Sequence, residues 1–234
     1  MNKPKILIIT TSAATMGTSD DPTGLWLEEL TTPWYAFVDA GVNLTLASIA
    51  GGRIPVDPRS LKPVGENDAS VDRALKDATF QRLITETSKF DTLDASHYDA
   101  ILLPGGHGTM FDYPENAALA RLVAAFDAAG KVVAAVCHGP AGLVGARKAD
   151  GTPVVAGRRV AAFTDSEERA AGLDKAVPFL LETRLKELGA QHESGPDFKP
   201  FALRDGNLVT GQNPASAKPL AKLVMEALAV RLSA

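Results

Sequence analysis

Cys137 is the only cysteine in the sequence, and its surroundings could make it a nucleophile. Residues 131–136 (KVVAAV) have the composition of a short buried strand, and a helix can begin soon after Gly139-Pro140. A sharp turn from a strand into a helix places the turn residue at the carboxyl edge of a sheet, with its side chain directed outward. The pattern therefore indicates a thiol that is positioned for attack on a substrate.

The neighbours of Cys137 support this interpretation. Ala135 and Gly139 are small, as the tight turn requires two positions on either side, and the adjacent His138 could accept the thiol proton. The N-terminus of a helix would also stabilise a thiolate. The alternative is an ordinary core cysteine, because free cysteine is among the most buried residue types.

The segment Pro104-Gly105-Gly106-His107-Gly108 follows another predicted strand and could provide an oxyanion site. Flexible backbone N–H groups at a sheet edge are what stabilisation of an oxyanion requires. An ordinary tight turn is the simpler alternative, and the glycine spacing is not that of a dinucleotide-binding loop. His107 and His138 could bind a metal ion, but the sequence suggests no third ligand.

Two glutamates are candidates for proton transfer. Helical periodicity places Glu29 at the edge of an apolar helix face and Glu28 on the opposite, solvated face. An inward carboxyl has a raised pKa suited to acid–base catalysis, unless its side chain reaches solvent. Glu168 could orient His138 as the third member of a Cys-His-Glu set, but the spacing from Asp165 is also that of a capping box. The spacing alone favours capping.

Strands and helices alternate along the chain. Strands are predicted at 5–11, 43–49, 98–103, 131–136, 152–156, 159–163, 201–204 and 207–210, and helices at 24–40, 71–76, 79–87, 115–129, 165–171, 177–188 and 213–232. Pro33 should kink or divide the first helix, and Asp205-Gly206 predicts a hairpin turn. This order predicts an α/β sandwich with a mostly parallel sheet, helices on both faces and ligands at the carboxyl ends of the strands.

The composition of the chain disfavours several classes of protein. The chain has 234 residues, of which 45% are hydrophobic and 22% charged, with a formal net charge of −4. These values are typical of a single globular domain, 1–234, and without a long Lys/Arg run we expect no nucleic-acid partner. The apolar stretches are too short for a signal peptide or a membrane span, and one cysteine fits a reducing compartment. We therefore expect a cytoplasmic protein.

Five spaced motifs resemble the ThiJ/PfpI superfamily, which is related to class I glutamine amidotransferases. They are Thr23-Gly24 with Glu29 and Pro33, Pro104 to Thr109 with Phe111 to Pro114, Ala135 to Gly142, Phe163-Thr164-Asp165 with Glu168, and Val209 to Ser216. Together they are similar to the stress-inducible glyoxalase III/chaperone branch found in yeasts and bacteria. The match is weakest over residues 51–90.

This resemblance implies a flavodoxin-like sandwich and a role for each candidate residue. Cys137 would be the nucleophile and His138 its proton-transfer partner, with Glu168 orienting His138 and Glu29 hydrogen-bonded to the thiol. The oxyanion site would lie at Gly105, Gly106 and His107, together with the backbone of His138. Members of the branch form homodimers and usually need no cofactor, so we expect a homodimer without cofactor or metal ion.

The expected reaction is a glutathione-independent conversion of methylglyoxal-like 2-oxoaldehydes to 2-hydroxy acids, with deglycation of proteins as a related activity. A cysteine amidase or peptidase would use the same residues on an amide substrate. A holdase chaperone or redox sensor would instead use an exposed apolar patch or an oxidisable Cys137. The sequence leaves these alternatives open.

Overall fold

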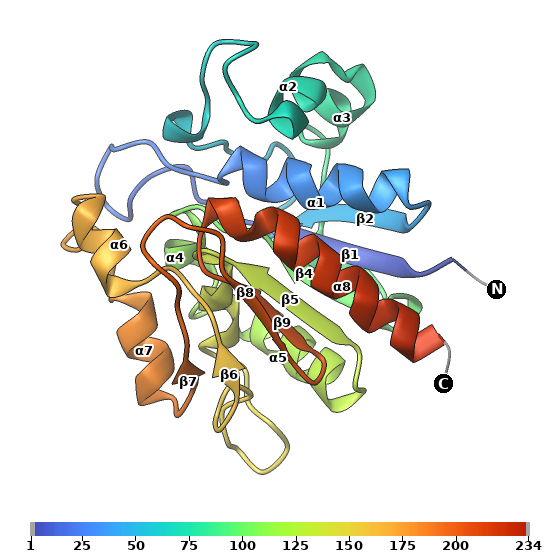
Figure 1. Ribbon diagram of the computed structural model, residues 1–234, viewed down its shortest axis with the longest axis vertical. Coiled ribbons are helices and arrows are strands. Elements are labelled where there is room, and N and C mark those ends of the chain that lie inside the picture. Colours follow the sequence, from blue (N-terminus) through green and yellow to red (C-terminus); the bar gives the residue numbers. More distant parts are fainter. Residues whose placement is uncertain (1–2, 233–234) are drawn as a thin grey trace.

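The computed structural model describes residues 3–232. Its centre is a seven-stranded sheet with the order β3-β2-β1-β4-β5-β9-β8 (Figure 1). Neighbouring strands are parallel except β8 and β9, which form an antiparallel hairpin. The strands are β1 Lys5–Thr10, β2 Asn43–Ser48, β3 Ser88–Lys89, β4 Ala100–Leu103, β5 Val132–Val136, β8 Ala202–Asp205 and β9 Leu208–Gly211. A separate two-stranded sheet pairs β6 Arg159–Val160 with β7 Gln191–His192.

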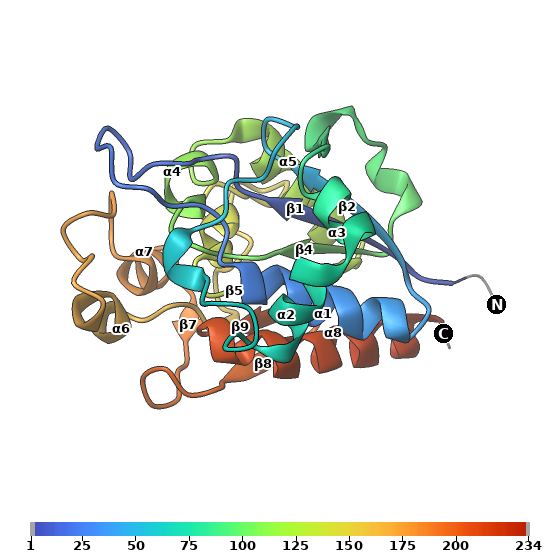
Figure 2. The ribbon, with the colours of Figure 1, turned by 90° about the horizontal axis from the view of Figure 1, so that it is seen from above.

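Helices cover both faces of the sheet, as Figure 2 shows. Successive residues of β1 alternate between two apolar clusters: Ile6 and Ile8 belong to the cluster that includes the helices Leu27–Asp39 and Ala217–Leu232, whereas Leu7 and Ile9 belong to the cluster that includes the helices Ala117–Ala128 and Leu181–Glu187. The α-helices are α1 Leu27–Asp39, α2 Ala69–Lys76, α3 Ala78–Leu83, α4 Thr109–Asp112, α5 Ala117–Ala128, α6 Asp165–Ala170, α7 Leu181–Glu187 and α8 Ala217–Leu232. Within residues 3–232, no helix combines the length and apolar character needed to cross a membrane.

The predicted three-layer α/β fold is confirmed, and so is the hairpin at Asp205-Gly206, but several boundaries differ. The strand predicted at 152–156 is wrong: this segment is a turn with a single bridge at Pro153. The strand predicted at 159–163 is reduced to Arg159–Val160 and joins the small sheet rather than the main one. α1 runs through Pro33 without dividing.

The carboxyl edge of the sheet brings distant loops together. β1 and β4 are neighbours, and the chain leaves them toward strands on opposite sides, which makes their junction a topological switch point. The loops after β1, β4 and β5 therefore meet at one edge. Cys137 follows β5 directly, and Gly105-Gly106 follow β4 by one residue.

Candidate active site

The predicted sharp turn is present at Cys137. Its φ angle is 59°, in the left-handed region that non-glycine residues seldom adopt. Its N–H donates to the Gly211 carbonyl at 2.9 Å, and its own carbonyl accepts from the Phe163 N–H at 3.0 Å. Gly139 has no side chain because a Cβ there would overlap the Leu103 carbonyl. The turn leads into a 3₁₀ helix, Gly139–Leu143, rather than the expected α-helix.

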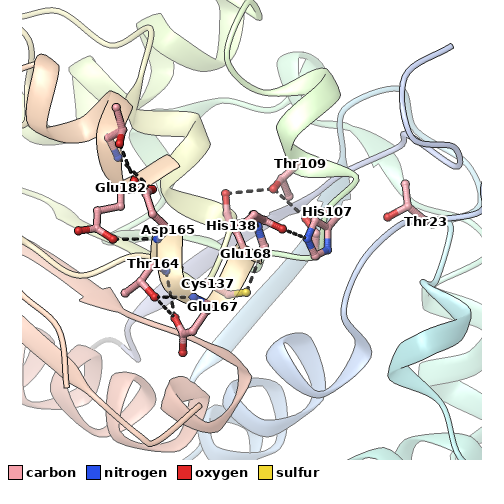
Figure 3. Close-up of polar contacts among 12 residues, drawn as sticks. Thr23, His107, Thr109, Cys137, His138, Thr164, Asp165, Glu167, Glu168 and Glu182 are labelled. Carbon is pink, nitrogen blue, oxygen red and sulfur yellow. Dashed lines mark hydrogen bonds and ion pairs between the residues drawn. The ribbon is translucent and has the colours of Figure 1, made fainter. Parts of the chain in front are cut away.

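A chain of short contacts links the thiol to a carboxylate, as Figure 3 shows. Cys137 Sγ lies 3.3 Å from His138 Nδ1, and His138 Nε2 lies 2.7 Å from Glu168 Oε2. All three side chains are buried. The Thr109 hydroxyl donates to the His138 carbonyl at 3.0 Å and so ties the residue after the nucleophile to the loop after β4. The structure therefore brings Cys137, His138 and Glu168 together in the order of a nucleophile, a base and an orienting acid.

Glu168 does not cap α6, so the capping role that its spacing from Asp165 favoured is wrong. The N-cap of α6 is Thr164, and its capping-box partner is Glu167. Glu168 is one residue further along and projects toward His107 and His138 instead. Burial alone would raise the pKa of Glu168, but the hydrogen bonds from the two histidines hold it well below its usual range. Glu168 is therefore an anion, and both Nε2 atoms must donate to it.

The side chain of His107 is hydrogen-bonded within the site. Its Nε2 lies 2.7 Å from Glu168 Oε1, and its ring centroid lies 4.0 Å from that of His138. Burial and the neighbouring His138 lower the pKa of His107 to about 4, so the ring is neutral near pH 7. Glu168 also supplies the third ligand that the sequence did not suggest: atoms of His107, His138 and Glu168 lie within 4.8 Å of one another. Nε2 of each histidine is already hydrogen-bonded to one carboxylate oxygen of Glu168.

Glu29 is fully buried, as its periodicity predicts. Its Oε2 accepts the Gly105 N–H at 2.8 Å, and Oε1 has no nitrogen or oxygen partner among the described residues. Burial raises the pKa of Glu29 to about 8, and its interactions with the Cys137 thiol and Gly105 offset this only in part. The group therefore carries a proton near pH 7. Glu28 is half-buried rather than solvated, because α2 packs beside α1.

The thiol itself is difficult to ionise in this state. Burial raises the pKa of Cys137 well above its ordinary value, and the nearby Glu29 adds to the effect. The expectation that a helix N-terminus stabilises the thiolate does not describe this site, because the following helix is a short 3₁₀ turn and the thiol is buried. Ionisation therefore depends on a proton acceptor within the site, and His138 Nδ1 lies 3.3 Å from the sulfur.

The four backbone positions expected at the oxyanion site, Gly105, Gly106, His107 and His138, are not equivalent. The Gly105 N–H is already donated to Glu29, so it is not free to bind an oxyanion. The N–H groups of Gly106 and His138 have no hydrogen-bond partner among residues 3–232. Gly105 must lack a side chain, since a Cβ would approach the His138 N and Val136 O to 2.7 Å. These two loops are thus packed backbone against backbone.

A cavity of about 190 Å³ opens onto Cys137, His138 and His107. Five residues of its wall were not singled out by the sequence, namely Trp26, Arg59, Ala171, Leu173 and Phe198, whereas Phe163 and Pro214 belong to the quoted motifs. Phe198 has a φ of 57°, and its N–H donates to the buried Glu167 at 2.7 Å. A left-handed phenylalanine leaves no recognisable signal in a single sequence. Arg59 lies in the 51–90 segment, where neither motif nor resemblance gave guidance.

Comparison with known proteins supports the same fold and function class. Residues 24–227 match the DJ-1/PfpI family. The chain is 32% identical to the glutathione-independent glyoxalase HSP31 of Saccharomyces cerevisiae, over 97% of this chain and 99% of the relative.

Two solved structures are also similar. The crystal structure of glyoxalase III from Candida albicans is 30% identical, with a TM-score of 0.85 over 96% of this chain and 97% of that one. The 24 kDa rapid encystment protein of Francisella tularensis is 37% identical, with a TM-score of 0.91 over 96% and 99% of the two chains. The fold, the strand-to-helix turn at Cys137 and these matches all agree. The chain belongs to the DJ-1/PfpI family.

Proposed function

We propose that this protein is a glutathione-independent glyoxalase that converts 2-oxoaldehydes such as methylglyoxal to 2-hydroxy acids. The observation that carries the proposal is that Cys137 and His138 line one small cavity, while Glu168 is hydrogen-bonded to His138 and a protonated Glu29 interacts with the thiol. The cavity is smaller than the roughly 300–1,000 Å³ that drug-sized ligands occupy, which suits a small substrate. The names of the yeast and Candida relatives agree with this function.

In the proposed mechanism, His138 Nδ1 accepts the Cys137 proton while Glu168 holds the imidazole at Nε2. The thiolate adds to the aldehyde carbon, and His138 returns the proton to the resulting alkoxide, which gives a hemithioacetal whose oxygen faces the free N–H groups of Gly106 and His138. The neutral His138 then takes the proton from the aldehyde carbon to give an enediol, and His138 or the protonated Glu29 donates a proton to the ketone carbon. The first carbon is oxidised to a thioester and the second is reduced to an alcohol. Water hydrolyses the thioester and releases the hydroxy acid and the thiol.

The test is lactate formation from methylglyoxal in the absence of glutathione. We expect turnover by the wild type and loss of nearly all activity in Cys137→Ala, with an unchanged circular dichroism spectrum. Retention of most activity by Cys137→Ala would contradict the assignment of the nucleophile.

An amidase or peptidase activity is the second candidate, because Glu168 aligned on His138 also completes the set that acyl transfer requires. A fluorogenic aminopeptide panel distinguishes the two functions. Cysteine-dependent peptide cleavage without lactate formation would favour the amidase.

Assembly and location remain proposals that follow from the family. We propose a homodimer acting in the cytoplasm on a small-molecule substrate. Light scattering on the purified protein tests the dimer: a monomer at micromolar concentration would contradict it.

A further inference from the structure

Arg59 differs from every other residue on the cavity wall. Among the described residues that line the cavity, it alone carries a permanent positive charge. Most of the remaining wall is apolar, formed by Trp26, Phe163, Ala171, Leu173, Phe198 and Pro214. A neutral substrate such as methylglyoxal offers this cation carbonyl oxygens but no opposite charge.

The position of Arg59 is set by a buried carboxylate. Asp57 is fully buried and accepts hydrogen bonds from the Arg59 N–H at 2.9 Å, from Nε at 2.9 Å and from Nη2 at 2.5 Å. It also accepts from the Thr23 hydroxyl at 3.0 Å, and its N–H donates to the Leu25 carbonyl beside Trp26. Arg59 holds the pKa of Asp57 below its usual range, although burial opposes this. The guanidinium is thus oriented before any ligand binds.

This arrangement leaves part of the guanidinium available. Asp57 uses the Nε–Nη2 edge, while Nη1 has no hydrogen-bond partner among residues 3–232. The Arg59 side chain is 39% exposed, whereas Asp57 is inaccessible. An arginine already fixed by a carboxylate loses little further freedom when it donates to a second acceptor. The free edge is therefore suited to a charge-assisted hydrogen bond with an anion.

Arg59 is also electrostatically close to the reacting groups. Its charge contributes to the lowered pKa of His107, and Glu168 contributes to the raised pKa of Arg59. Since Arg59 and Cys137 line the same small cavity, one short molecule can contact both.

We propose that Arg59 forms an anion subsite, and that the preferred substrate is a 2-oxoaldehyde with a carboxylate at the end remote from the aldehyde. This rests on the proposed function, whose chemistry is unchanged: the internal oxidation and reduction involve only the two carbonyl carbons, one water is consumed, and the remote carboxylate is not altered. The carboxylate serves only for binding.

The test compares 4,5-dioxopentanoate with its methyl ester, which has the same oxoaldehyde and chain but no charge. The readout is the ratio of the two initial kcat/KM values, acid over ester. We expect the wild type to favour the acid, with a ratio that falls about 10- to 100-fold in Arg59→Met, mainly through KM. Arg59→Lys should recover part of the preference. Arg82→Met, on exposed α3 outside the cavity, is the matched control and should keep the wild-type ratio.

Arg59→Met leaves Asp57 buried without its partner, so the variant could fail to fold for a structural reason. The double variant Asp57→Asn/Arg59→Met removes both charges, so the same acid-to-ester ratio can be measured in a protein that has no unpaired buried charge. A folded double variant with the wild-type ratio would overturn the proposal, as would a wild type that does not distinguish acid from ester.

A binding measurement separates this proposal from the proposed function. 4-Oxopentanoate has the carboxylate but no aldehyde, and it should protect Cys137 from iodoacetamide more strongly than its methyl ester does, in an Arg59-dependent way. If the wild type turns over none of 4,5-dioxopentanoate, its ester and methylglyoxal, the glyoxalase assignment fails. The protection of Cys137 by 4-oxopentanoate still tests the anion subsite in that case. Equal protection by acid and ester would overturn it.

Discussion

Glu29 and Glu168 are both buried glutamates near one thiol, yet their surroundings give them opposite protonation states. Glu168 accepts hydrogen bonds from two imidazoles, which lower its pKa against the effect of burial. Burial raises the pKa of Glu29 to about 8, because its hydrogen bond from Gly105 offsets burial only in part. Near pH 7 the site therefore holds Glu168 as a carboxylate and Glu29 as a carboxylic acid. In many enzymes, two carboxyl groups whose pKa values are pushed apart in this way take different roles in proton transfer.

The adjacent Glu28 and Glu29 offer a direct test at this scale. Glu29→Gln preserves size but removes the transferable proton, so kcat for methylglyoxal should fall by about 10²–10⁴, as is typical for a general acid or base. Glu28 is half-buried and faces away from the cavity, so Glu28→Gln should change kcat less than twofold and stability by less than about 0.5 kcal/mol. Lactate assays and urea unfolding measure the two quantities.

Alkylation of Cys137 gives the same substitution an independent readout. The carboxylate of Glu29 contributes to the raised pKa of Cys137, so Glu29→Gln should move the pH profile of iodoacetamide reaction to lower pH. Similar kinetic effects from both glutamine variants, or an unmoved alkylation profile, would show that Glu29 does not interact with the thiol as described.

At the scale of elements, α6 connects local folding to the site. Thr164 and Glu167 cap its N-terminus, and Glu167 also accepts from the Phe198 N–H and from Asn213 Nδ2. Glu168 follows directly, so its direction depends on the first turn of this six-residue helix. The helix α6 thus positions both the Glu168 carboxylate, which binds His138, and Phe198, which lines the cavity.

Thr164→Ala should therefore affect stability and catalysis together. Loss of the cap should lower the free energy of unfolding by about 1 kcal/mol, and misdirection of Glu168 should lower kcat about tenfold or more. Asp68→Ala is the control, because Asp68 caps α2 through the Ser70 N–H, away from the cavity. It should lose similar stability while keeping kcat. Equal kcat losses in both variants would contradict the positioning role of α6.

The sequence predicted those parts of the site that depend on local pattern. Cys137 and His138 follow a recognisable strand and turn, whereas periodicity placed Glu29 at the edge of the apolar helix face and the family resemblance placed it beside the thiol. Glu168 was ambiguous, because two neighbouring glutamates both lie near a helix start and only the structure shows that Glu167 serves the cap. Arg59 and Phe198 escaped prediction because they reach the cavity through long loops, whose course depends on tertiary packing rather than on periodicity.

At the scale of the whole molecule, the topology concentrates function at one edge. The segments after β1, β2, β4 and β5 converge there, so the nucleophile Cys137 and the anchored cation Arg59 line one cavity, and Glu29 of α1 interacts with the thiol. This arrangement also removes several ionisable groups from water, including Glu29, Glu168 and Asp57, which opposes folding. Such burial makes the stability of the fold depend on pH.

Glu29 makes one contribution to this pH dependence of stability, and the direction of its pKa shift determines the sign. A glutamate in the unfolded chain has a pKa near the reference value of 4.5, whereas in the folded protein burial raises the pKa of Glu29 to about 8. Between these values the folded state binds more protons than the unfolded state, so stability falls as pH rises. The contribution is fully present below about pH 4.5 and is lost as the pH passes through about 8. One proton corresponds to about 1.4 kcal/mol per pH unit.

Glu29→Gln removes this contribution because glutamine does not titrate. The free energy of unfolding of the wild type minus that of the variant should therefore decrease between pH 5 and about pH 8 and level off above it. Urea unfolding at half-unit pH steps measures the difference. Asp112→Asn is the comparison, because burial raises the pKa of Asp112 only to about 6 and its slope should end near that pH. A wild-type-minus-variant difference for Glu29 that is flat from pH 6.5 to 8 would show that Glu29 is already ionised there, and would remove the proton that the proposed mechanism assigns to it.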